Sequence, residues 1–102
     1  PHHGSAGSAS EAFVAATGAR LALVSSGAGN RFGHPRKPVV DRWCESGAEV
    51  VDTARAGAIR IWLGAEGLQV RERRAAQPRL WDTARRRGGT AGLCYVPEMQ
   101  RP

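Results

Sequence analysis

Cysteine is scarce in this sequence, and long apolar runs are absent. The two cysteines, Cys44 and Cys94, form no C-x-x-C pair, which predicts neither a disulfide framework nor a zinc ribbon. We expect Cys44 to be a small core residue and assign no role to Cys94. No apolar stretch approaches the roughly 20 residues of a membrane helix, and no basic stretch leads into an apolar one at the start. We therefore expect a soluble segment without a signal peptide.

Acidic side chains are in the minority. Nine Asp and Glu stand against 15 Lys and Arg, and the formal net charge is +6. Most of this excess lies in residues 71–102, which carry eight arginines. A basic tail favours polyanions such as nucleic acid or anionic lipid, but a solvated, weakly structured end has the same composition. We therefore divide the chain into a folded part, 1–70, and a basic, arginine-rich, weakly structured tail, 71–102.

The first half of the folded part predicts one helix and one strand. Ser8 and Glu11 have the spacing of a capping box, and apolar residues recur on one face from about residue 9 to residue 17. Gly18 is a natural stop for that helix. The apolar run 21–24 does not alternate, so we expect a strand covered on both faces.

The second half predicts another helix and three strands. Pro38 suits the first turn of a helix that runs to about residue 46 and ends at Gly47. Its expected buried stripe is Val39, Val40, Trp43 and Cys44, with Asp41, Arg42 and Glu45 facing water. Residues 49–51 form a short strand, and 58–63 pair with 68–70 as a hairpin. The order of these elements predicts an α/β fold in which a layered sheet has two flanking helices.

All three histidines lie beside glycine or proline in expected loops. His2 and His3 precede Gly4 and Ser5, and His34 lies between Gly33 and Pro35. Imidazole is a common ligand of zinc and similar metals, and sites are often built from loops at strand ends. Taken alone, the first motif also matches the remnant of an affinity tag, and a single loop histidine is more often a surface residue.

Several ordered motifs resemble one known family, the bacterial DNA-internalisation competence proteins of the ComEC type. The resemblance is to their metallo-β-lactamase-like domain and spans about residues 1–63. The motifs are His2-His3-Gly4-Ser5, Ser8 and Ser10 before a helix with Phe13, Val24-Ser25-Ser26-Gly27, Asn30-Arg31-Phe32-Gly33-His34-Pro35, Thr53, and Gly57-Ala58-Ile59. Because the match continues without a break past Ser5, it argues against the tag interpretation.

The resemblance implies a fold and a site. The fold would be the C-terminal portion of the αββα sandwich of metallo-β-lactamase-like hydrolases. His2, His3 and His34 would face two divalent metal ions, zinc or manganese, with Ser5, Asn30 and Arg31 supporting the site or touching phosphate. The family's H-x-H-x-D-H loop and its bridging aspartate are not in this chain, which begins without Met or a preceding strand. We expect both upstream, in the missing N-terminal half of the domain.

The implied function is metal-dependent hydrolysis of DNA phosphodiester bonds during DNA uptake. The parent would lie in the bacterial inner membrane, with a membrane channel domain and DNA as partners, and this fragment would be inactive alone. Two alternatives stay open. One is another hydrolase of the same fold, such as a phosphodiesterase or phosphocholine esterase. The other is a non-enzymatic basic fragment that binds nucleic acid through its arginines, with Trp62 and Trp81 stacking on bases.

Overall fold

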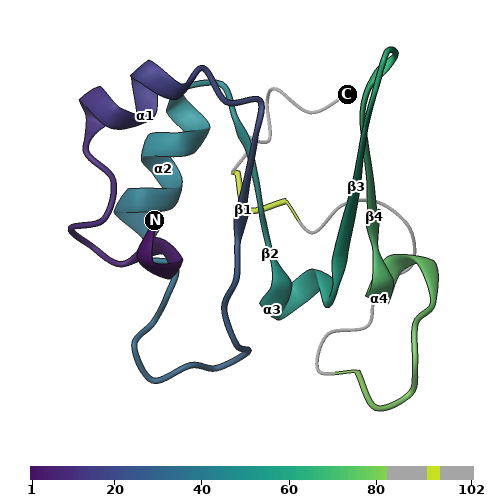
Figure 1. Ribbon diagram of the computed structural model, residues 1–102. Helices are drawn as coiled ribbons and strands as arrows, with labels where there is room; N and C mark the ends of the chain where they lie inside the picture. The colour runs from purple at the N-terminus through teal and green to yellow at the C-terminus, as the bar shows by residue number, and fades with distance from the viewer. Residues whose placement is uncertain (83–91, 95–102) are drawn as a thin grey trace, which may run out of the picture.

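The chain forms a small mixed α/β structure, for which a computed structural model describes residues 1–82 and 92–94 (Figure 1). The elements in chain order are η1 (His2–Gly4), α1 (Glu11–Thr17), β1 (Leu21–Val24), α2 (Lys37–Glu45), β2 (Glu49–Asp52), α3 (Thr53–Ala56), β3 (Ile59–Gly64), β4 (Gly67–Glu72) and α4 (Arg73–Ala76). Within the described residues, no helix has the length and hydropathy that crossing a bilayer requires.

The strands pair in two separate sheets rather than in one layer. β1 runs parallel to β2, with Leu21 opposite Glu49 and Val24 opposite Asp52. β3 and β4 form the antiparallel hairpin that the sequence predicts. Figure 1 shows α1 and α2 on one side of the β1–β2 pair and the hairpin on the other. The described residues form a mixed α/β structure, as expected, but not a single layered sheet. The sandwich fold implied by the resemblance stays a prediction.

The core lies between α2 and the β1–β2 pair. The buried apolar residues of this main cluster are Ala9, Val14, Val39, Val40, Trp43, Ala48 and Val50. Val39, Val40 and Trp43 are the stripe predicted for α2, and their spacing places them on one helix face. A second, smaller cluster joins Val51 and Ala56 to Leu21 and Ile59, so it holds the base of the hairpin against β2.

Three local predictions are wrong in detail. Ser10, not Ser8, caps α1, because its Oγ accepts a hydrogen bond from the amide of Phe13. β1 is not covered on both faces, since the side chain of Leu23 is 45% exposed. Arg42 does not simply face water: its guanidinium donates to the backbone carbonyl of Ala9 and links the start of α1 to α2. Because Arg42 and Ala9 are far apart in the sequence, helical periodicity could not predict their contact.

The expectation of unpaired cysteines is also wrong. Cys44 on α2 and Cys94 are joined by a disulfide, with their Cα atoms 5.5 Å apart. Gly92 forms an antiparallel bridge with Val51, and the amide of Leu93 donates to the carbonyl of Val50 at 2.8 Å. Residues 92–94 of the expected tail are therefore fastened along β2.

Ordered structure also crosses the boundary expected after residue 70. β4 continues to Glu72, and α4 begins at Arg73. Asp82 then accepts hydrogen bonds from the side chain of Arg73 and from the amide of Arg79. The arginine run at 85–87, expected to be a solvated part of the tail, lies outside the described residues.

Candidate metal centre

The two histidine-bearing loops lie against each other. The backbone amide of Arg36 donates to the carbonyl of Gly4 at 2.9 Å. A Cβ added to Gly4 would lie 2.5 Å from the Cβ of Pro35 and 2.8 Å from its Cα, and Gly4 has a φ of +80°. Only glycine permits both this conformation and this approach. Gly4 therefore allows the backbone of the first loop to approach the second loop closely.

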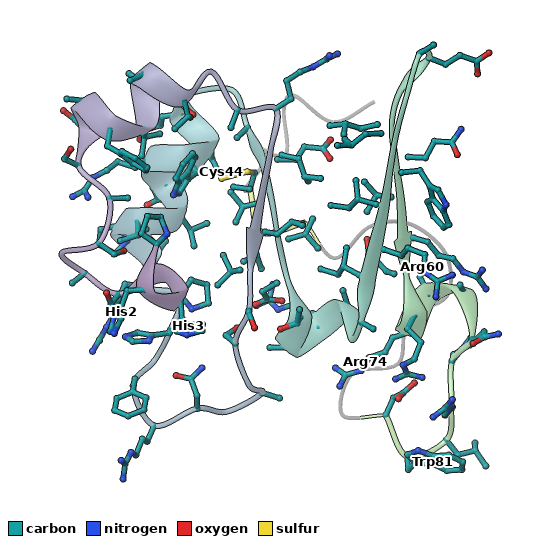
Figure 2. All side chains as sticks on the ribbon, viewed as in Figure 1. His2, His3, Cys44, Arg60, Arg74 and Trp81 are labelled. Carbon is teal, nitrogen blue, oxygen red and sulfur yellow. A yellow bond between two sulfur atoms is a disulfide. The ribbon has the colours of Figure 1, made fainter. Side chains whose placement is uncertain are left out.

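This contact brings the three histidines together. The ring centroid of His2 lies 6.1 Å from that of His3 and 6.1 Å from that of His34. His3 and His34 also line one cavity of about 280 Å³, which Ser25, Ser26, Gly27, Asn30 and Phe32 complete. In Figure 2, His2 and His3 lie together on the first turn, on the opposite side of the molecule from Arg60 and Trp81.

Hydrogen bonds fix the orientation of two of the imidazoles. Nδ1 of His3 lies 2.6 Å from the carbonyl oxygen of Ser25, and Nδ1 of His2 lies 2.8 Å from Oγ of Ser5. A carbonyl oxygen only accepts, so Nδ1 of His3 carries a proton and the lone pair of the neutral ring is on Nε2. Metal-binding histidines are oriented by contacts of this kind.

The backbone of the first turn is unusual. His2 has a φ of 47° and His3 a φ of 55°, which is the left-handed region that non-glycine residues rarely occupy. Each such residue costs on the order of 1 kcal/mol, and strained residues cluster at functional sites. The contacts with Ser5, Ser25 and Pro35 hold this turn in place.

Asn30 shapes the second loop. Its side-chain nitrogen donates to the carbonyls of Gly27 and His34, and its Oδ1 accepts from the amide of His34 at 2.9 Å. Asn30 therefore fixes the backbone position of His34. Because all its described bonds go to backbone atoms, they account for asparagine here without a ligand.

Aromatic contacts place Arg31 at the rim of the candidate site, outside the cavity that His3 and His34 line. The ring of Phe32 stacks on that of His34, with centroids 5.6 Å apart, and the guanidinium carbon of Arg31 lies 4.9 Å from the centroid of Phe32. Arg31 is exposed and does not line the cavity of His3 and His34. Its charge therefore lies beside the histidines rather than among them.

The environment of His34 favours its neutral form. Partial burial lowers the pKa of His34 below 6.5, and the nearby Arg36 guanidinium, with His2 and His3, lowers it further. Neutral imidazole is the form that binds metal. At neutral pH His34 therefore presents an uncharged ring toward His2.

Ser26 in the cavity wall and Thr53, which bonds to it, were not singled out from the sequence as site residues. Thr53 Oγ1 accepts from the amide of Ser26 at 2.9 Å and donates to the carbonyl of Ser26 at 3.0 Å, so the start of α3 holds the wall of the cavity. The hydroxyl of Ser26 is itself buried without a hydrogen-bond partner. Both residues belong to motifs of the resemblance, which was the only available signal.

The fit to a metal is partial. Imidazole suits zinc and manganese, and the unpartnered Ser26 hydroxyl marks a polar wall in the cavity. Among residues 1–82 and 92–94, however, no three or more His, Cys, Asp or Glu side chains are grouped closely enough to hold a metal ion. The described residues alone therefore do not form a metal site.

One curated protein similar to this chain is the competence protein ComA of Neisseria gonorrhoeae. The two are 34% identical over 73 residues, which is 72% of this chain and 11% of that protein. The chain thus spans about a ninth of the length of its relative. No family model matches, and no solved structure matches. The similarity relates the chain to the competence-protein family.

Proposed function

We propose that the chain is the C-terminal part of a metal-dependent hydrolase domain, a DNA phosphodiesterase, in a bacterial DNA-uptake protein. The similarity to a competence protein supports the role in DNA uptake. The approach of His34 to His2 and His3 supports the metal site, and this single observation carries the proposal. The metallo-β-lactamase-like sandwich belongs to the proposal as well.

The residues of this chain would form one side of the site. His2, His3 and His34 would bind zinc or manganese ions, with the ring of His3 held by Ser25 and the loop of His34 held by Asn30. When bound, two divalent ions polarise phosphoryl oxygens and lower the pKa of bound water to near neutrality. Arg31, exposed at the rim, would contact the phosphate backbone of DNA.

The remaining ligands would come from outside this chain. Zinc takes four ligands and manganese up to six, and a two-metal site needs bridging carboxylates in addition to imidazoles. Asp41 and Asp52 line a cavity together with His34, but the described residues contain no group of three or more His, Cys, Asp or Glu side chains close enough to hold a metal ion. We place those ligands in the missing N-terminal half of the domain, in a parent that also has a membrane channel domain in the inner membrane.

Paramagnetic broadening tests whether the histidines bind metal. Substoichiometric Mn²⁺ added to the 102-residue chain should broaden the imidazole NMR signals of His2, His3 and His34 before other signals, and EDTA should restore them. Single His2→Ala and His3→Ala variants would show which ring is the ligand, because losing it weakens the effect on His34. Broadening that spares His34, or that first affects the exposed carboxylates, would overturn the proposal.

A nuclease assay tests the incompleteness of the site. With Mn²⁺ or Zn²⁺, we expect little or no cleavage of DNA by residues 1–102, because three imidazoles do not complete two metal sites. Adding the upstream segment of the parent should produce cleavage that a His34→Ala variant lacks. Robust cleavage by the isolated chain would show that no further ligands are needed.

A further inference from the structure

The β3–β4 hairpin has two chemically different faces. Alternate residues of a strand point to opposite sides, so the pairing register assigns each residue to a face. One face carries Ile61 opposite Val70 and Leu63 opposite Leu68. The other carries Arg60 opposite Arg71, followed by Trp62 opposite Gln69. Arg73, whose amide donates to the carbonyl of Ala58 at 2.9 Å, extends this second face, which we call the arginine–tryptophan face.

The central pair of this face carries uncompensated charge. Arg60 and Arg71 are direct cross-strand partners, and both are exposed. Like charges directly opposite each other destabilise a sheet. Neither guanidinium forms an ion pair with a carboxylate in residues 1–82 or 92–94, whereas Arg73 pairs with Asp82. An anion between Arg60 and Arg71 would relieve their repulsion.

The surface at this pair is concave. A cavity of about 480 Å³ is lined by Ala58, Ile59, Arg60, Arg71, Arg73 and Gln77. Guanidinium groups bind phosphate through paired N–H donors, and two of them on facing strands can approach one phosphate from both sides. The cavity therefore combines the shape and the charge that a phosphate group needs.

A flat aromatic ring lies one step further along the same face. Trp62 is 44% exposed, and the guanidinium carbon of Arg60 lies 5.8 Å from the centroid of its ring. The contact with Arg60 orients the indole while leaving part of it open. Phosphate-binding arginines beside an open aromatic ring are how proteins bind single strands, since every base has a face that can stack.

We infer that the arginine–tryptophan face binds single-stranded nucleic acid, with a phosphate between Arg60 and Arg71 and a neighbouring base on Trp62. The exposed leucines, which would favour a lipid surface, lie on the opposite face of the hairpin. This binding would need no metal, and it involves none of the residues of the candidate metal centre. It therefore goes beyond the proposed function and does not depend on it.

Fluorescence anisotropy with a labelled 12-nucleotide oligothymidylate tests the inference, in EDTA and over a range of salt concentrations. The Arg60→Gln/Arg71→Gln variant should bind about tenfold or more weakly, and the slope of log K against log salt should fall by about 0.7 for the one phosphate held between the two arginines. The matched control is Arg20→Gln/Arg55→Gln, which removes the same charge from exposed positions elsewhere. Trp62→Leu should weaken binding at least about fivefold with an unchanged salt slope.

Backbone NMR on the unmodified chain keeps the test independent of variant folding. Addition of a six-nucleotide oligothymidylate should shift the amides of 60–62 and 69–71 most. Equal affinity and slope for the Arg60/Arg71 and control variants would overturn the inference, and so would amide shifts confined to other segments. Vesicles of anionic phosphatidylglycerol test the alternative that this face binds lipid. If the variants lose vesicle binding but keep oligonucleotide binding, the face is a lipid site and the inference is wrong.

Discussion

Gly4 and Pro35 meet without room for a methyl group between them, since a Cβ on Gly4 would lie 2.5 Å from the Cβ of Pro35. This contact joins the loop of His2 and His3 to the loop of His34, and the Arg36 amide bond to Gly4 lies beside it. The candidate metal centre therefore depends on a residue that offers no side chain of its own.

Gly4→Ala should lower stability and separate the two loops. The substitution places a side chain at a φ of +80° and against the backbone of Pro35, and each effect costs on the order of 1 kcal/mol or more. Thermal unfolding measures the loss. Gly7→Ala is the control, because a Cβ at Gly7 meets nothing within 4 Å, and it should leave the midpoint almost unchanged. Equal midpoints for the two variants would contradict the role of the contact.

Reduction of the Cys44–Cys94 disulfide should destabilise the fold. The bond closes a loop with a sequence separation of 50, which corresponds to about 4 kcal/mol by the chain-entropy relation, and measured values are often smaller. Denaturant unfolding with and without a reducing agent gives the difference. A Cys44→Ala/Cys94→Ala variant should already have the lower stability and should not respond to the reducing agent. An unchanged midpoint on reduction would contradict the stabilising role of the disulfide.

His34 should titrate below an ordinary histidine in the metal-free chain. Partial burial is the larger cause and the Arg36 guanidinium the second, and both favour the neutral ring. Because the folded-state pKa is lowered, this contribution to stability is complete above about pH 6.5 and is lost as the pH falls toward the lowered pKa. Imidazole NMR titration measures the pKa directly. Arg36→Gln should raise it partway, and a pKa of 6.5 or above in the unmodified chain would contradict the prediction.

Asp82→Asn should weaken the attachment of the segment that follows α4. The side chain of Asp82 is 4% exposed, and it receives hydrogen bonds from Arg73 and the amide of Arg79. The hydrogen bond from Arg73 is the largest cause that holds the pKa of Asp82 below 3.8, so its contribution is present at neutral pH and lost as the pH falls through the lowered pKa.

The exposed Lys37–Asp41 pair on α2 provides a control for Asp82, because such surface pairs contribute little. At neutral pH, Asp82→Asn should lower the thermal midpoint clearly more than Asp41→Asn does. The difference should shrink in strong acid. Equal effects of the two substitutions at neutral pH would show that Asp82 does not anchor the segment.

Local patterns in the sequence predicted most of the elements. The apolar stripe of α2, the β1 segment and the β3–β4 hairpin all follow from periodicity and from the turn at Gly64 to Gly67. The short helix α3 was missed because its four residues are too few for a periodic signal. A pattern that repeats over several residues predicts the element. An element too short for such a pattern is not predicted from the sequence.

Contacts between distant segments could not be predicted in the same way. The pairing of Cys44 with Cys94 depends on where residues 92–94 lie, which no local pattern records. The two histidine loops were expected to meet only because the resemblance implied it. The bonds that hold them, from His3 to Ser25 and from Arg36 to Gly4, are accepted by backbone carbonyls, which every residue has. Such bonds leave no trace in residue identity.

The two edges of the β1–β2 sheet differ in their ability to pair with a further strand. Gly92 and Leu93 occupy the side of β2 that faces away from β1, whereas β1 has no second strand partner within residues 1–82 and 92–94. The amides and carbonyls along Leu21–Val24 are therefore the place where another polypeptide can join the sheet by backbone pairing. An additional strand, whether from the parent protein or from a second molecule, would pair with β1 rather than with β2.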